Sequence, residues 1–256
     1  MMNMINKIDI CGVPVDDVSA QNAINLIFSL AKSAKTGNLV VTVNSEFIML
    51  ARRSEEFLKI LKSAQLSLAD GAWVVFLKRI LGGKFQNRIT GSDLIEMVCS
   101  QGAKKTVGIG FLGGFGGVAK TVSKRQMKAY PGLKVVFSEA GNPSIGYDKR
   151  IRRQILRSGR IDILFVAYGM GKQEYWIQRN REKLNVGVFI GVGGAFDYIS
   201  GKKRRAPRFL MESGFEWLWR LICEPSRMWR MRVLPYFFFF SLFNCFFKKL
   251  GILEKK

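Results

Sequence analysis

The chain has 256 residues, of which 48% are hydrophobic and 23% charged, and its formal net charge is +22. This composition excludes a disordered chain, and the strong positive charge favours anionic partners: nucleic acid, acidic lipid headgroups or phosphorylated substrates. The sequence has no histidine, which excludes Ser-His and Cys-His catalysis, and its four cysteines lack the CxxC spacing of a zinc site.

Short apolar runs alternate with helix-period segments over about the first 195 residues. A strand is predicted at 7–15, followed by a helix over 16–34 with Asp16 or Asp17 as its cap. Further strands are predicted at 38–44, 66–70, 105–114, 133–141, 161–169 and 186–194, and helices over 45–64, 71–81 and 115–130 and from Asp148 and Lys172 onward. Such alternation predicts an α/β fold with a mainly parallel sheet flanked by helices.

The composition changes at about Gly201. Residues 200–256 carry 13 Lys or Arg against 4 Asp or Glu and contain no strand-like run. We therefore predict an α/β core over 1–200 and a basic, aromatic helical appendage over 201–256. Its prolines, Pro207, Pro225 and Pro235, should break the appendage into pieces.

Polar residues stand where several predicted strands end, which is where ligands bind in open parallel sheets. They are Thr42 and Asn44, Asp70, Gly113 and Gly114, and the segment 172–174 (Lys, Gln, Glu) after the turn that follows 161–169. Asp70 lies among apolar neighbours, and burial would raise its pKa and make it a usable general base. The alternative is that Asp70 caps the helix that starts at Gly71.

A glycine pattern at 108–113, "GIGFLG", matches the GxGxxG spacing of dinucleotide sites, with Glu139 as a candidate ribose-binding acid. These glycines begin inside the predicted strand, so the turn itself is better placed at 113–117, "GGFGG". Backbone amides there could accept a nucleotide diphosphate at a helix N-terminus. An NAD-dependent oxidoreductase is the alternative function that this pattern leaves open.

Charged residues also follow the last predicted strand. Asp197 could cap a helix or pair with the basic cluster at 202–205. Arginines of this region could clamp phosphate groups, or they could be solvated charge beside an anionic membrane. These are Arg204, Arg205, Arg220, Arg227 and Arg230.

Nine short motifs occur in an order that resembles the WecG/TagA/CpsF glycosyltransferase family. They are "TVN" (42–44), "LADGAWVV" (68–75), "RITGSDL" (88–94), "FLGG" (111–114), "YPGL" (130–133), "KQEYWI" (172–177), "GVGGAFD" (191–197), "RRAP" (204–207) and "EWLWRLICEPSRMWR" (216–230). The resemblance implies a Rossmann-like core with a C-terminal helical appendage that reaches the membrane. It also implies inverting transfer from a UDP-sugar to a polyprenyl-diphosphate-linked saccharide in cell-surface polysaccharide synthesis.

The resemblance also assigns roles to residues of this chain. Asp70 matches the general base, with Thr42, Asn44, Arg88 and Gln173 as companions, and Arg220, Arg227 and Arg230 match arginines that reach toward diphosphate groups. The resemblance implies a donor sugar of the N-acetylmannosamine type, its uronic acid or a hexose. No DxD motif is present, so no metal and no other cofactor are expected. The family usually has proline where Gly171 stands, which predicts a looser turn before Gln173.

The segment 234–247 is a phenylalanine-rich run of 14 residues between basic flanks. It is shorter than the roughly 20 apolar residues that span a bilayer. We expect it to lie on an anionic membrane surface, although a buried core helix is the alternative. The N-terminus has no hydrophobic signal region, so we expect a peripheral protein on the cytoplasmic face of the plasma membrane. No nucleic acid partner is expected, although a nucleic-acid-binding protein is the rival interpretation of the charge; a homo-oligomer is left open.

Overall fold

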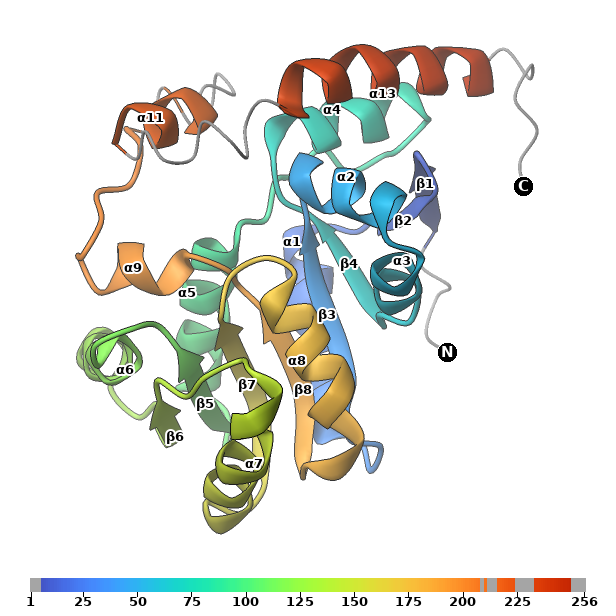
Figure 1. The fold of residues 1–256 in the computed structure, drawn as a ribbon. Helices are drawn as coiled ribbons and strands as arrows, with labels where there is room; N and C mark the ends of the chain where they lie inside the picture. The colour runs from blue at the N-terminus through green and yellow to red at the C-terminus, as the bar shows by residue number, and fades with distance from the viewer. Residues whose placement is uncertain (1–5, 208–209, 211–215, 224–232, 250–256) are drawn as a thin grey trace.

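A computed structural model describes residues 6–207, 210, 216–223 and 233–249. Its central sheet has six parallel strands in the order β4-β3-β8-β7-β5-β6 (Figure 1). These are β3 (Asn38–Val43), β4 (Leu66–Ala69), β5 (Gly108–Gly113), β6 (Lys134–Glu139), β7 (Ile161–Ala167) and β8 (Val186–Gly191). The predicted α/β fold with a mainly parallel sheet is confirmed.

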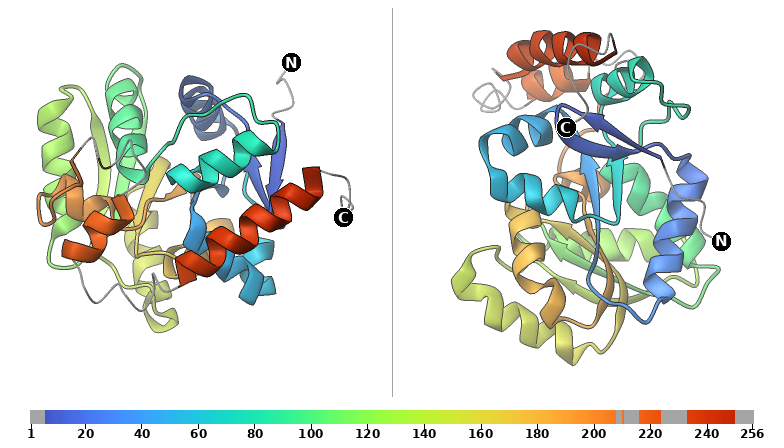
Figure 2. Two further views of the ribbon diagram at one scale, coloured as in Figure 1. Left: turned by 90° about the horizontal axis from the view of Figure 1, so that it is seen from above. Right: turned by 90° about the vertical axis from the view of Figure 1, so that its right-hand side faces the viewer.

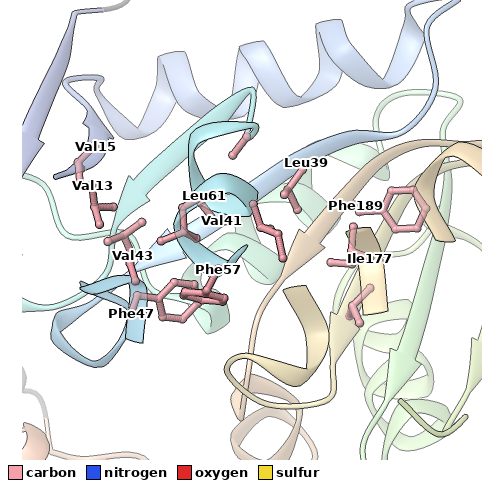
Figure 3. Close-up of a cluster of buried hydrophobic side chains, with 14 of the residues drawn as sticks. Val13, Val15, Leu39, Val41, Val43, Phe47, Phe57, Leu61, Ile177 and Phe189 are labelled. Atoms are coloured by element: carbon pink, nitrogen blue, oxygen red, sulfur yellow. The ribbon is translucent and has the colours of Figure 1, made fainter. Parts of the chain in front are cut away.

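Helices cover both faces of this sheet. One face carries α1 (Ala20–Lys32), α5 (Gly91–Gly102), α6 (Val118–Ala129) and α9 (Ala195–Ile199). The other carries α2 (Ser45–Arg53), α3 (Glu55–Lys62), α7 (Asp148–Arg157) and α8 (Lys172–Asn180), with the 3-10 turns η1 (Ile145–Tyr147) and η2 (Arg181–Lys183) beside them. Because every residue of β3, β4, β5 and β8 is buried, their apolar runs are continuous rather than alternating. Figure 3 shows part of the hydrophobic core on this second face, to which Val41, Phe57 and Ile177 belong. Helix α5 was not among the predicted elements.

The first predicted strand is wrong in one respect. Residues 7–15 do not form one strand but part of an antiparallel hairpin, β1 (Lys7–Ile10) and β2 (Val13–Asp16). The chain reverses at Cys11 and Gly12, whose φ angles are +54° and +89°. A backbone in the left-handed region ends strand pairing and starts a turn.

The predicted cap of α1 is also wrong. Ser19 is the N-cap, and its side chain accepts a hydrogen bond from Asn22 N. Asp16 instead accepts one from Ser67 N at 2.6 Å. Asp17 accepts hydrogen bonds from Lys84 N and Phe85 N and pairs with Lys78 Nζ at 3.3 Å. Asp16 therefore joins β2 to β4, and Asp17 joins the segment after β2 to α4 (Ala72–Ile80) and the loop that follows it.

The C-terminal region adds α11 (Glu216–Cys223) and α13 (Val233–Lys249). Figure 2 shows α13 lying alongside α4 (Ala72–Ile80). Trp73 Nε1 donates a hydrogen bond to Ser241 Oγ at 2.9 Å, and the Trp73 and Phe238 rings meet edge to face at 4.7 Å. Leu234, Phe237, Ser241 and Cys245 are buried by this packing. Their spacing of three or four residues places them on one face of the helix.

The opposite face of α13 is exposed. Tyr236, Phe239, Phe243 and Phe246 have exposed fractions of 58%, 80%, 62% and 57%. The alternative of a buried core helix therefore holds for one face of α13 and fails for the other. None of the helices in the described part of the chain combines the length and apolar character that crossing a bilayer requires.

Candidate active site

A cavity of about 530 Å³ lies at the carboxyl ends of the parallel strands. Each of the six strands is followed by residues that line it, namely Asn44, Asp70, Gly114, Asn142, Tyr168 and Gly193. Side chains that are far apart in the sequence meet there because all six strands run in one direction and end at one edge. A concave site of this size with several convergent polar groups is typical of a ligand-binding site.

Five of the predicted site residues line this cavity: Thr42, Asn44, Asp70, Gly114 and Gln173. Thr42 Oγ1 donates a hydrogen bond to Gly191 O at 3.2 Å, which joins β3 to β8 at the cavity floor. Asn44 Oδ1 accepts one from Phe47 N at 3.1 Å, so Asn44 is the N-cap of α2. The two side chains are thereby held in place by the ends of the elements that carry them.

Asp70 follows β4 directly, and its backbone N donates to Val43 O at 2.8 Å. The N-cap of α4 is Gly71, with φ +132°, so the interpretation of Asp70 as the cap of this helix is wrong. Asp70 is half-buried rather than buried, which differs from the burial that the apolar neighbours suggested. The residue therefore lines the cavity and stays partly accessible, so a substrate hydroxyl can approach it.

Gln173 is held at both ends of its amide. Its Nε2 donates a hydrogen bond to Glu174 Oε1 at 2.7 Å, and its Oε1 accepts one from Gly193 N at 2.9 Å. Glu174 Oε2 accepts a third from Gly171 N at 2.7 Å. The looser turn that Gly171 predicted is thus not observed, because the turn is closed by a bond that proline, lacking an N–H, could not donate.

Glu174 is fully buried, and this burial raises the pKa of its carboxyl to about 7, although the hydrogen bonds from Gln173 and backbone amides oppose the rise. The folded protein therefore binds this proton more tightly than the unfolded chain does. Relative to Glu174→Gln, the wild-type free energy of unfolding should fall as the pH rises from the ordinary value of 4.5 to about 7, and then level off. At about 1.4 kcal/mol per pH unit, the fall is on the order of 3 kcal/mol. Denaturant unfolding of both proteins at a series of pH values measures it; a flat difference would contradict the burial.

The glycine pattern at 108–113 lies wholly inside β5. A side chain at Gly110 would meet Leu164 at 2.7 Å, so this glycine serves packing between strands. Glu139 pairs with Lys120 at 3.4 Å and is not among the residues lining the cavity. Neither half of the dinucleotide pattern therefore reaches the candidate site.

The turn at 113–117 does reach the site through Gly114 and Phe115. Gly113, Gly114, Gly116 and Gly117 all have positive φ, and Gly117 is the N-cap of α6. Gly113 does not line the cavity; a side chain on it would lie 2.5 Å from Ala167 O. Gly113 therefore allows β5 and β7 to close together, while Gly114 opens toward the cavity.

Basic residues approach the cavity from the segment after α9. Lys202, Lys203 and Arg205 all line it. Arg205 forms an ion pair with Asp93 and donates to Thr90 Oγ1 at 3.3 Å. Burial of Asp93 disfavours its charged form, but the hydrogen bonds from Arg205 and Thr90 outweigh this and hold the pKa of Asp93 below its ordinary value.

Asp197 also lines the cavity, within the first turn of α9, whose N-cap is Gly194. The interpretation of Asp197 as a helix cap is therefore wrong. Its Oδ2 lies 3.4 Å from Lys203 Nζ, which confirms the expected pairing with the basic cluster.

The remaining predicted residues lie elsewhere. Arg88 is half-buried two residues before Thr90 and does not line the cavity. Arg220 lies in α11, where the structure describes the backbone and not this side chain, and Arg227 and Arg230 lie outside the described residues. Their roles stay predictions. The sequence did not single out Ser92 or Tyr168, and it named Lys202 only as part of the basic cluster at 202–205. Tyr168 stands at the end of a predicted strand, so the rule that pointed to Asp70 also applies to it.

The sequence matches the model of the glycosyl transferase WecG/TagA/CpsF family over residues 8–250. The chain belongs to this family. A relative from Bacillus subtilis (strain 168) is 33% identical over 201 residues, which cover 78% of this chain and 77% of the relative. One from Staphylococcus aureus (strain NCTC 8325) is 26% identical over 234 residues, or 91% of each chain. Both relatives are named N-acetylglucosaminyldiphosphoundecaprenol N-acetyl-beta-D-mannosaminyltransferase. The family resemblance that the nine motifs indicated is thereby confirmed.

Proposed function

We propose that this glycosyltransferase moves a sugar from a UDP-sugar to a polyprenyl-diphosphate-linked saccharide, with inversion at the anomeric carbon. The observation that carries the proposal is a polar cavity that Asp70 lines together with Thr42, Asn44 and Gln173, in a chain of this family. The names of the relatives support a diphosphoundecaprenol-linked acceptor and an N-acetylmannosamine-type donor.

In this mechanism Asp70 removes the proton of the acceptor hydroxyl, whose oxygen attacks the anomeric carbon as the bond to UDP breaks. Negative charge then develops on the departing diphosphate. Lys202 and Arg205, with the amides of the glycine turn, are placed to stabilise it. Among the described residues no three His, Cys, Asp or Glu side chains gather as a metal site, and transfer without a metal stays a prediction.

One experiment separates this function from its two rivals. In separate thermal-shift titrations with UDP, NAD and an oligonucleotide, UDP should raise the melting temperature. A panel of UDP-sugars is then tested with a short-chain diphosphate-linked N-acetylglucosamine acceptor, and the product linkage is determined by NMR. Stabilisation by NAD or oligonucleotide, with no product from any donor, would contradict the proposal.

Lys202 supplies a test of the diphosphate contact. Lys202→Gln should weaken UDP binding about tenfold, because it removes one positive charge from the cavity wall. Lys202 Nζ lies 6.0 Å from the centre of the Phe115 ring. Lys105→Gln is a matched control, since Lys105 Nζ also lies over a phenylalanine ring, that of Phe28 at 4.4 Å, but does not line the cavity. Calorimetry measures both affinities; equal affinities would show that UDP lies away from Lys202.

We further propose that the exposed face of α13 contacts the membrane on the cytoplasmic side. The last turn of α2 carries the exposed Arg52 and Arg53, and α4 carries the exposed Arg79. These are the two helices on which α13 packs, and the Arg52 guanidinium lies 3.5 Å from the centre of the Phe240 ring. Rings that enter the acyl boundary beside cations that meet anionic headgroups form an interfacial anchor.

A further inference from the structure

Glu174 lies directly behind the cavity wall without lining it. Its side chain is fully buried, and Gln173, which does line the cavity, is 1% exposed. Three hydrogen bonds run in series through the pair: from Gly171 N to Glu174, from Gln173 Nε2 to Glu174, and from Gly193 N to Gln173 Oε1. The loop after β7 is thereby joined to the loop after β8 through these two side chains.

The direction of the Gln173 amide follows from the chemistry at the two ends of this series. The N–H of Gly193 can only donate, and Glu174 accepts at both of its oxygens, from Gly171 N and from Gln173 Nε2. Gln173 must therefore turn its nitrogen toward Glu174 and its oxygen toward Gly193. A reversed amide would place donor against donor at Gly193 and acceptor against acceptor at Glu174, which costs free energy at a buried site.

Two glycines make this arrangement fit. Gly171 has φ +80°, a conformation closed to proline, and its N–H is the donor to Glu174. A side chain at Gly191 would lie 2.7 Å from both Gln173 Nε2 and Glu174 Oε1. Because residue 191 at the end of β8 has no side chain, the side chains of Gln173 and Glu174 can occupy this space.

We propose that Glu174 is a positioning residue, which fixes the Gln173 amide so that it offers one N–H and one oxygen lone pair to sugar hydroxyls in the cavity. The inference rests on the proposed sugar transfer. Glu174 touches no substrate itself and acts through Gln173, whose second N–H and second lone pair remain for a ligand.

The test uses two variants of the full-length protein. Glu174→Gln keeps the volume but places two amides in series between two N–H donors, so one donor must face another whichever way the amides turn. The double variant Gln173→Glu with Glu174→Gln satisfies every partner again, because residue 173 then accepts from Gly193 N and from the amide of residue 174. It presents a carboxylate, instead of an amide, to the cavity.

Glu174→Gln should lower the melting temperature and lower kcat/KM about 10²-fold, the scale expected when a substrate-positioning group is misplaced. The double variant should regain the melting temperature while kcat/KM stays low. If Glu174 had a purely structural role, the double variant would regain both the melting temperature and kcat/KM, and that result would overturn the proposal. A wild-type kcat/KM in Glu174→Gln would overturn it as well.

Asn38→Asp is the control for destabilisation alone. Asn38 is buried at the amino end of β3, away from the cavity, and its Nδ2 donates to Lys35 O and Gly187 O. Losing these bonds should lower the melting temperature without changing kcat/KM at temperatures where the protein is folded. Absence of transfer by the wild-type protein would overturn the proposed function, whereas wild-type transfer with an unaffected Glu174→Gln would overturn this inference alone.

Discussion

Asp70→Asn should abolish measurable sugar transfer, with kcat lowered by about 10²–10⁴, because the acceptor hydroxyl loses the group that removes its proton. The amide has nearly the volume of the carboxylate, so affinity for the UDP-sugar should stay within a few-fold of wild type. The melting temperature should also stay close to that of the wild-type protein. Steady-state kinetics with the donor panel, together with calorimetry of UDP binding, measures these quantities.

Asp162→Asn is a matched control for this substitution. Asp162 is also half-buried in the sheet, where its Oδ2 accepts a hydrogen bond from Gly108 N at 2.7 Å. It lies near the amino end of β7, at the opposite edge of the sheet from the cavity. This variant should lose some stability and keep its kcat. Near wild-type turnover in Asp70→Asn would show that another group is the general base.

Replacing Tyr236, Phe239, Phe243 and Phe246 together by serine should release the protein from anionic vesicles. At about 1 kcal/mol for each partly inserted ring, the partition coefficient should fall on the order of 10³-fold. The buried face of α13 is unchanged, so the melting temperature should hold. Transfer to a membrane-embedded acceptor should fall, while transfer to a short-chain acceptor in solution should not. Vesicle sedimentation and the two activity assays measure these effects.

A control set removes four exposed apolar side chains elsewhere. Met127, Ile145, Tyr147 and Leu156 are 40%, 72%, 47% and 53% exposed, on or beside α6 and α7, which lie far from α13 (Figure 1). Their replacement by serine should leave vesicle binding unchanged. If this control set lost binding while the α13 variant kept it, the membrane-facing surface would lie on α7 rather than on α13.

The pattern of apolar runs was sufficient to predict the parallel sheet, because strands buried on both faces carry continuous hydrophobic residues. It failed at 7–15, where a left-handed Cys11 makes a hairpin that no alternation of polar and apolar residues reveals. The rule that ligands bind at strand ends brought Asn44, Asp70 and Gln173 to one cavity. The same rule also pointed to Lys172 and Glu174, which do not line the cavity, and it could not tell that Glu174 lies behind the wall.

By itself, the sequence determined the six strands of the parallel sheet, most of the helices between them and the family, because these reside in local pattern and in the order of short motifs. Only the tertiary structure decided which basic residues close on the cavity, since Arg205 reaches Asp93 across more than a hundred residues of chain. The same holds for the phenylalanine-rich segment 234–247. Its rings are spread around the whole helix, so no period in the sequence separates two faces. Packing on α2 and α4 buries Phe237 and leaves Phe239 exposed, because burial depends on which neighbours a face meets.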